Sequence, residues 1–444
     1  MRSLFYTLAI LFLFCKITIG QVGASIFDDS KIHTISINSL DRIKYEEFHD
    51  ELYRVYKSDL KNNTSDKTYT AASVVIDSIT IDTIGLRYKG QSTFKGLPAN
   101  GKYSFKIDFN EFILGQKFDG LKKLSLNNNR LDVTCMRNKL ALESMMRMGI
   151  EAPRTSYAKV FVNGANRGLY LLVEQVDEIF VNQRFSSDST GFLYDVNGWT
   201  GGPQVAPTPS NLEKQLLPKT RRDENNYQSI IDVWNITNET PDSLFYDVVS
   251  EVYDYDNFIR QMAVQTFVGD RDHYCVSGSN HYLYQNPKSG KFVMIPWDYD
   301  LSWIKDWYGG DYLNIRNPVT WSDCSEHQNS VYATKMLNVP EITNKYHHAL
   351  CEVLNHGFDS LWVEERINTL SALIGKEVVN DPVHFAQFDD FEYQLDNSYT
   401  FISYRSYIDP HVFHGMRNLI RHRYADVRDA LREAGYDCHY QKRE

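Results

Sequence analysis

Cysteine is scarce in this sequence, and the cysteines that are present lie far apart. There are six in 444 residues, with no Cys-x-x-Cys pair and no cysteine–histidine group at the spacing of zinc ligands. The sequence therefore predicts no zinc site. Without Cys15, which lies in an N-terminal apolar stretch, five cysteines remain, so at most two disulfides form and one thiol stays free.

Several common catalytic and nucleotide-binding motifs are missing too. There is no Gly-x-Ser-x-Gly elbow, no Gly-x-x-x-x-Gly-Lys-Ser/Thr loop and no Gly-x-Gly-x-x-Gly fingerprint. The chain also lacks an excess of positive charge, because its net charge is −10 and its pI is about 5.7. We therefore expect no nucleic-acid partner and no general affinity for anionic membranes, although a local basic phosphate site is compatible with this charge.

Only the N-terminus carries a long apolar run, at residues 4–15, and no later stretch reaches the length of a membrane span. Its length and flanking residues predict a signal peptide over 1–20. We expect a mature chain that begins near Gln21, has no transmembrane span and is secreted or held in the secretory pathway or at the cell surface; an uncleaved anchor is the alternative. Glycosylation sequons, which would mark surface loops, begin at Asn62, Asn63, Asn235 and Asn238.

The most informative stretch spans residues 269–303. Two aromatic and β-branched runs, 281–285 and 291–297, predict strands, and the Asn, Pro, Ser and Gly residues between them favour a turn. The two ends of a hairpin meet. Residues that precede the first strand should therefore lie close to residues that follow the second.

Acidic residues stand at both ends of this predicted hairpin. Asp270 and Asp272 precede it. Asp298 and Asp300 follow it, and they share one face if the strand continues through them. Clustered carboxylates repel one another unless a cation joins them, and oxygen ligands suit Mg²⁺ or Mn²⁺. The pattern predicts a divalent metal site, with solvated loop acids as the alternative interpretation.

A second charged pattern lies in the alternating sequence of residues 102–109, which predicts a strand. Lys102 and Lys106 fall on one face of this strand, and aromatic and aliphatic residues fall on the other. Two lysines that follow a glycine-containing loop are suited to bind phosphates. A solvated strand face is the plainer interpretation, since most lysines are exposed.

The remaining periodicity predicts a mixed order of elements. Apolar residues at helical spacing predict a helix over 133–148, with Asp132 as its N-cap and Gly149 as its end. Residues 200–226 and 305–330 have the composition of surface loops. Further helices are predicted over 41–61, 177–185, 241–270, 341–357, 360–378 and 412–435, and further strands over 73–90, 156–162, 167–176 and 191–199. This order predicts an α+β, two-lobed protein.

Four segments, in this order along the chain, resemble the CotH family, the spore-coat-H-like atypical protein kinases. They are RYKGQSTFKGLPANGKYSFKIDF (87–109), KKLSLNNNRLDVTCMRNKLALESMMRMGIEAP (122–153), NGANRGLYLLVEQVD (163–177) and DHYCVSGSNHYLYQNPKSGKFVMIPWDYDLSW (272–303). The resemblance covers most of residues 75–430. It departs from the family pattern at Lys89, where arginine is frequent, and at His281, where an aromatic residue is usual.

The resemblance implies a protein-kinase-like fold. A small strand-rich lobe would span 71–182 and a larger, mainly helical lobe 183–440, with an insertion at 200–226 and an N-terminal segment at 21–70. ATP would lie between the lobes with Mg²⁺ or Mn²⁺.

The resemblance also implies roles for individual residues in ATP binding. Lys106 is the first choice for the lysine that binds the phosphates, and Lys102 is the second. Arg87 and Lys89 would lie near the phosphates. The other two implied positions are Glu143, as the partner of the lysine on a helix, and Glu174, at the hinge beside the adenine.

The implied catalytic residues lie in 269–303. Asp272 would be the catalytic base, with Asp270 as the competitor for that role. Asn280 and Asp298 would hold the metal ions, with help from Asp300.

The leading hypothesis is a secreted kinase that transfers the γ-phosphoryl group of ATP to serine or threonine of extracellular or lumenal proteins. One alternative is a surface or adhesion protein, as in invasin-like relatives, that uses the same fold for binding. Another is a different ATP-dependent transfer to protein, such as adenylylation or amino-acid ligation. The presence of Asp272, Asn280 and Asp298 argues against an inactive kinase but does not choose between these transfers.

Overall fold

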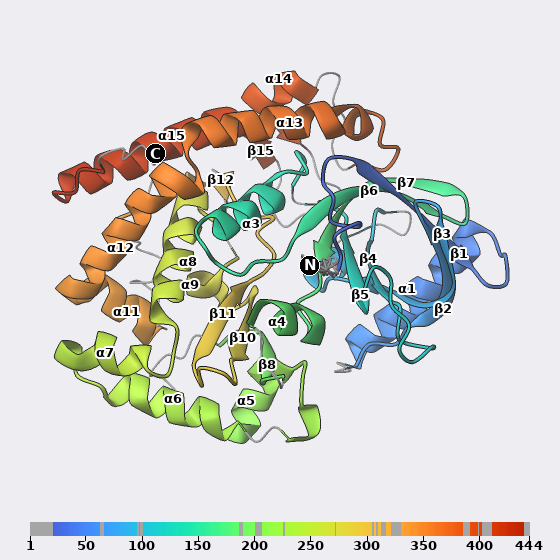
Figure 1. Ribbon diagram of the computed structural model, residues 1–444. Helices are drawn as coiled ribbons and strands as arrows, with labels where there is room; N and C mark the ends of the chain where they lie inside the picture. The colour runs from blue at the N-terminus through green and yellow to red at the C-terminus, as the bar shows by residue number, and fades with distance from the viewer. Residues whose placement is uncertain are drawn as a thin grey trace, which may run out of the picture.

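The computed structural model describes most of the chain from residue 21 to residue 438. The described residues are 21–62, 66–95, 97, 101–130, 132–185, 190–199, 207–224, 227–270, 272–303, 306–307, 310–311, 317–320, 330–384, 391–397, 399–401 and 411–438. The predicted signal peptide and most of the predicted loop at 305–330 lie outside them. Figure 1 shows a strand-rich part beside a mainly helical part, which confirms the predicted α+β class.

The strand-rich part is a closed barrel of seven described strands, in the order β1-β2-β3-β4-β5-β7-β6. β1 closes the barrel because it pairs antiparallel with β2 and parallel with β6. Residues 21–70 supply β1 and the covering helix α1 (Tyr45–Lys61), so they belong to the barrel instead of forming a separate segment. The barrel strands are β1 (Ile32–Ser39), β2 (Thr70–Ile76), β3 (Ile79–Lys89), β4 (Ser104–Asp108), β5 (Lys123–Asn127), β6 (Thr155–Val162) and β7 (Ala165–Glu174).

Alternation along β3 and β4 gives the barrel an apolar inner face and a charged outer face. Tyr88 and Phe105 are buried in the barrel core. Their neighbours Arg87, Lys89 and Lys106 are only half-buried. Successive strand residues point to opposite faces, so these three cations share the outer face.

The second part packs helices around a four-stranded sheet, in the order β11-β10-β8-β9. Its core is continuous with α3, which lies between the barrel and the long helices. The longer helices and the sheet strands are α3 (Arg137–Arg147), α4 (Glu178–Phe185), α6 (Gln228–Glu239), α8 (Tyr255–Val268), α11 (Val331–Asn338), α12 (Pro340–Glu352), α13 (Ser360–Val379), α15 (Met416–Glu433), β8 (Leu193–Val196), β9 (Leu216–Pro218), β10 (His281–Gln285) and β11 (Phe292–Pro296). None of the helices in the described ranges has the length and apolar character of a membrane span.

Shorter elements complete the described chain. They are α2 (Ser92–Lys95), α5 (Pro209–Gln215), α7 (Phe245–Ser250), α9 (Tyr274–Ser277), α14 (Phe391–Asp396), the 3₁₀ turns η1 (Arg222–Glu224) and η2 (Asp242–Leu244), the π-helical turn η3 (Val353–Gly357), and two small sheets of β12 (Asp306–Trp307) with β13 (Gly310–Asp311) and β14 (Tyr399–Phe401) with β15 (His411–Phe413).

Two predicted hairpins are confirmed. β6 and β7 meet at Asn163 and Gly164, whose φ angles of 46° and 80° suit a two-residue hairpin turn. β10 and β11 pair with His281 opposite Pro296. Both turns form where the residues in them tolerate the backbone that the turn requires.

Two loop predictions are wrong. Residues 200–226 were expected to form a surface loop, but the described residues from 207 to 224 contain α5, η1 and the strand β9, which pairs with β8. The sequons at Asn235 and Asn238 lie on helix α6 instead of in a loop.

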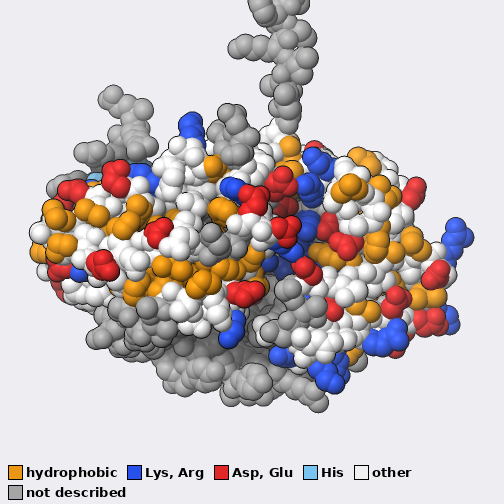
Figure 2. Space-filling model, turned by 90° about the horizontal axis from the view of Figure 1, so that it is seen from below, with side chains coloured by type: hydrophobic (Ala, Val, Ile, Leu, Met, Phe, Trp, Pro, Cys, Tyr) orange, Lys and Arg blue, Asp and Glu red, His pale blue; other side chains and the backbone are white. Residues whose placement is uncertain are grey.

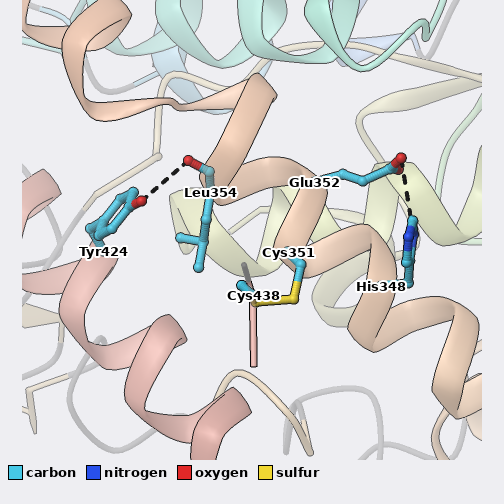
Figure 3. The surroundings of a disulfide bond; sticks show 6 residues. All are labelled: His348, Cys351, Glu352, Leu354, Tyr424 and Cys438. Carbon is cyan, nitrogen blue, oxygen red and sulfur yellow. Dashed lines mark hydrogen bonds and ion pairs between the residues drawn. A yellow bond between two sulfur atoms is a disulfide. The ribbon is translucent and has the colours of Figure 1, made fainter. Parts of the chain in front are cut away.

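The cysteines match the expected count. Cys351 and Cys438 form a disulfide that ties α12 to the segment after α15 (Figure 3). Beside it, the hydroxyl of Tyr424 donates a hydrogen bond of 3.4 Å to the carbonyl of Leu354. Cys275 is also disulfide-bonded, and Cys135 is a free, buried thiol.

Candidate functional site

The first wall of the candidate site is the outer face of β3 and β4, which carries Arg87, Lys89 and Lys106. Arg87 lies directly opposite Lys106 in the antiparallel register, and Lys89 lies opposite Ser104. The Nζ atom of Lys89 is 2.6 Å from Oδ1 of Asn127 on β5. Strand pairing therefore places three cations side by side on one surface.

Lys106 lies on this surface without a counter-ion. Among the residues that the structure describes, no carboxylate lies within ion-pair distance of its ammonium group. Burial lowers the pKa of Lys106 well below its ordinary value, and the neighbouring charges of Arg87, Lys219 and Lys123 lower it further. An anion bound here would offset both the cost of burying this charge and its repulsion by the neighbouring cations.

The second wall is formed by the two ends of the β10–β11 hairpin, as predicted. Asp298 and Asp300 follow β11, and Asp270 and Asp272 precede α9, which leads into β10. Burial raises the pKa of Asp300 well above its usual range, and the charges of the other three acids raise it further. Burial also raises the pKa of Asp298. The carboxylates are thus close enough to repel one another.

The strand does not continue through Asp298 and Asp300, so the condition under which they would share one strand face is not met. β11 ends at Pro296, and Asp298 has a φ of 59°, in the left-handed region that non-glycine residues seldom adopt. Strained backbone of this kind is concentrated at functional sites. The chain therefore leaves the sheet before the two acids.

Asp270 and Asp272 have different surroundings. Asp270 is 1 % exposed, and its carboxylate accepts hydrogen bonds from the backbone N–H of Asp272 at 2.8 Å and from the hydroxyl of Ser302 at 3.2 Å. Burial raises the pKa of Asp270 to about 8. Asp272 is half-buried, and its backbone carbonyl accepts a hydrogen bond of 2.5 Å from the side chain of Asn280. Asp270 thus positions the loop, while the carboxylate of Asp272 is the more accessible of the two.

The two walls face each other at Lys89. Burial lowers the pKa of Lys89 to about 8, while the negative charge of Asp298 acts in the opposite direction. The ammonium group also lies 5.3 Å from the centre of the Trp297 ring. In Figure 2, lysine and arginine side chains gather beside acidic ones in the hollow between the two parts of the molecule.

The acidic wall fits a divalent cation only in part. Within the described ranges, no three His, Cys, Asp or Glu side chains are arranged to hold a metal ion by themselves. Asp298 and Asp300 nevertheless offer carboxylate oxygens whose repulsion a cation would offset, and the side chain of Asn280, whose amide nitrogen donates to the carbonyl of Asp272, carries a further oxygen ligand. The remaining ligands would have to be oxygens of a bound phosphate or water, as is common for Mg²⁺.

Three predicted residues lie elsewhere. Lys102 is 1 % exposed, and its ammonium group donates to the carboxylate of Asp381 at 2.7 Å and to the carbonyl of Leu169 at 2.6 Å. It is therefore already satisfied and does not contact the acids. The alternation that placed it beside Lys106 does not apply, because β4 begins only at Ser104.

Glu143 is not the partner of Lys106. It lies on α3, where its carboxylate pairs with Lys139 at 2.9 Å and with Arg366 of α13 at 2.7 Å. Asp29 joins the same network. The glutamate therefore connects elements within the fold.

Glu174 ends β7, at the connection between the barrel and α4, but its carboxylate is 1 % exposed and bound by two arginines. Arg154 pairs with it at 2.6 Å and Arg184 at 2.5 Å. The carboxylate of Glu174 is thus held by two arginines of the fold, and its place beside the adenine stays a prediction.

Sequence reasoning missed several residues that surround the site. Asp132 was assigned only as a helix cap, yet its charge also raises the pKa of Asp300. Asp177 follows β7, and the charges of Lys106 and Lys123 oppose the rise in its pKa that burial causes. Both acids directly follow or precede a predicted element, which is the signal that could have identified them.

Comparison with known proteins identifies relatives over most of the chain. A family model described as CotH kinase protein matches residues 86–408. Inner spore coat protein H of Bacillus subtilis is 28 % identical over 319 residues, which are 70 % of this chain and 83 % of that protein.

Invasin CotH2 of Rhizopus delemar is 22 % identical over 38 % of this chain and 30 % of its own length. Among solved structures, a complex of Shewanella oneidensis HipA with HipB and its operator DNA aligns over 89 % of this chain and 84 % of that chain, at 10 % identity and a TM-score of 0.34. A TM-score this low does not establish a common fold.

Proposed function

Because the chain belongs to the CotH family, we propose that it is a kinase-like enzyme that transfers the γ-phosphoryl group of ATP to serine or threonine of secreted or surface proteins. The observation that carries the proposal is a cationic wall, in which Lys106 has no carboxylate partner among the described residues, opposite a mutually repelling acidic wall. Such walls complement a polyanion with its counter-cation, which phosphoryl transfer requires.

In this proposal, the phosphates lie over β3 and β4. Lys106 and Arg87 donate hydrogen bonds to the phosphate oxygens, and Lys89 lies between the phosphates and Asp298. Their positive charge stabilises the charge that spreads over the transferred group.

Asn280, Asp298 and Asp300 would hold Mg²⁺ or Mn²⁺, which supplies further positive charge to the phosphates. The acceptor hydroxyl loses its proton to the carboxylate of Asp272 as its oxygen forms a bond to the γ-phosphorus. The bond from that phosphorus to the bridging oxygen breaks, and ADP leaves with the electron pair. Asp270 positions Asp272 through the hydrogen bond to its backbone.

Labelled ATP tests this proposal. The purified protein, with Mn²⁺ and an extracellular protein mixture, should transfer label from γ-labelled ATP and not from α-labelled ATP. Asp298→Ala should lower the transfer at least about 100-fold, because it removes a proposed ligand of the metal ion that would stabilise the charge on the phosphates. The control Asp426→Asn changes an exposed acid on α15 and should leave the transfer unchanged. Transfer of the α-label alone would assign adenylylation and overturn the kinase assignment.

Adhesion is the second candidate function, and the similarity to proteins named invasins favours it. The chain aligns with 30 % of one invasin and 40 % of the other, so their activity is not carried over as a whole. Adhesion to host cells that survives Asp298→Ala, with no label from either ATP, would support binding over catalysis.

A further inference from the structure

The loop between β4 and β5 exposes three consecutive large apolar side chains. Phe112 is 48 % exposed, Ile113 is 46 % exposed and Leu114 is 93 % exposed. Apolar residues are often exposed singly, but a contiguous group marks a surface that binds something. We call Phe112, Ile113 and Leu114 the apolar tip.

The apolar tip is held by an ordered backbone. The side-chain oxygen of Asn110 accepts a hydrogen bond of 2.7 Å from the N–H of Gly115, which closes the loop. The side-chain amide of Gln116 donates to the carbonyls of Thr83 and Phe109 at 2.7 and 2.9 Å, which fixes the loop to β3 and to the end of β4. The exposure of the tip is therefore built into the fold.

A further exposed apolar residue lies at the same end of the barrel. The antiparallel register places Asp108, at the end of β4, opposite Gly85, and Ile79 at the start of β3, six positions further along that strand, is 55 % exposed. Lys89, at the other end of β3, faces the acids. Lys89 lies six positions along the strand from Thr83, which the loop contacts, a distance of about 20 Å. Contacts at the tip would thus leave the candidate site open.

We propose that the apolar tip inserts into the surface of an electrically neutral lipid bilayer, and this proposal does not depend on the proposed function. The tip projects outward, and three side chains are too small an area for a stable protein interface, which buries about 1,200–2,000 Å². A bilayer needs no matching pocket and accepts a projecting apolar group directly.

The charges around the tip select the kind of lipid. Glu111 and Lys117 flank it, both are exposed, and their charges cancel. Lys122, the next lysine along the loop, is already paired with Glu178 at 2.7 Å. Without a cluster of free cations beside the tip, anionic headgroups would add little to binding.

Flotation with phosphatidylcholine vesicles tests the proposal. The protein recovered from the medium of expressing cells should float with the vesicles, and the triple variant Phe112→Ser, Ile113→Ser, Leu114→Ser should lose at least about tenfold in partitioning. The control Leu361→Ser removes a leucine that is 74 % exposed on α13, and it should float like the unchanged protein. All variants carry the same N-terminus, so any contribution of that segment cancels.

Other outcomes would overturn the proposal. Equal flotation of the triple variant and the unchanged protein would assign the binding to another surface. Binding that requires phosphatidylserine would assign it to charge. If the unchanged protein does not float, but is a dimer in solution while the triple variant is a monomer, the tip binds a second copy of the chain. Thermal unfolding of each variant identifies any loss that comes from misfolding.

Discussion

Two groups of charged residues lie between the barrel and the helical part, and they differ in how their charges are balanced. In the first group, which we call the seam, each charge has its counter-ion: Lys102 pairs with Asp381, and Glu143 pairs with Lys139 and Arg366. In the second group, the candidate site, cations lie on one wall and acids on the other. The cation Lys106 has no carboxylate partner among the described residues.

The difference separates structural from functional charge. A buried ion pair holds its elements in place, because removal of one partner strands the other in a medium of low dielectric. A charged group without a counter-ion destabilises the folded protein instead, and such groups are typical of sites that bind a ligand. Substitutions should therefore lower stability in the seam and lower activity in the site.

The largest effect on stability is expected for Asp381→Ala. Both side chains of the Lys102–Asp381 pair are fully buried, and Asp381 also accepts a hydrogen bond of 2.9 Å from the N–H of Leu169. We expect the free energy of unfolding to fall by about 3–5 kcal/mol in chemical denaturation. The control is Glu377→Ala, which breaks a partly exposed pair between α13 and Lys159 and should cost less than about 1 kcal/mol. Equal effects of the two changes would contradict the distinction.

Lys106→Met should show the reverse pattern. The change removes a half-buried cation that has no carboxylate partner among the described residues, so the free energy of unfolding should stay the same or rise. Phosphoryl transfer from ATP should fall about 100-fold, because a charge that faces the phosphates is lost. Lys376→Met, on the exposed surface of α13, should change neither quantity. A strong loss of stability in Lys106→Met would show that this lysine has a structural role, like the charged residues of the seam.

The hairpins and most helices could be predicted because their signals are local. Asn163 and Gly164 specify their turn directly, and the 281–297 hairpin consists of two aromatic and β-branched runs on either side of turn-forming residues. The closure of the barrel could not be predicted, since β1 pairs with β6, more than a hundred residues away. Local periodicity carries no information about which strands meet.

The candidate site was predictable to the extent that it depends on the same local patterns. The hairpin brings its acids together, and strand alternation puts Arg87 and Lys106 on one face. The counter-ion of Lys102, Asp381, and one counter-ion of Glu143, Arg366, come from distant segments that nothing near these residues in the sequence indicates. Lys139, four residues before Glu143 on the same helix, is a pair that helical spacing could have indicated. A sequence pattern thus identifies a charged residue, but it does not show whether that residue forms an ion pair in the folded protein.

The pH dependence of stability tests whether Asp270 is the acid of this wall that holds a proton in the folded protein. Burial raises the pKa of Asp270 from its ordinary value of 3.8 to about 8. Between these values the folded protein holds a proton that the unfolded chain has released. The stability that this proton contributes is therefore complete below pH 3.8 and is lost as the pH rises through about 8. The free energy of unfolding should fall by at most about 1.4 kcal/mol per pH unit in this window.

Asp270→Asn tests this assignment, because asparagine keeps an acceptor for the N–H of Asp272 and does not titrate. Urea denaturation between pH 5 and 8, with a chelator present, should show a flatter pH dependence for this variant than for the unchanged protein. The same change at exposed Asp426 should leave the slope as it was. An unchanged slope in Asp270→Asn would show that other acids of the wall hold the proton.

The smallest effect is expected where a charge pair between the two parts is exposed. Arg222 in η1 pairs with Asp66 of the barrel part at 2.6 Å, but their side chains are 50 % and 74 % exposed. Water and salt screen such a pair, so a double-mutant cycle of Arg222→Ala and Asp66→Ala should give a coupling free energy below about 0.5 kcal/mol, and less in high salt. A coupling as large as that of a buried pair would mean that exposure does not rank these contacts. Burial would then not separate the structural pairs of the seam, such as Lys102–Asp381, from exposed surface pairs.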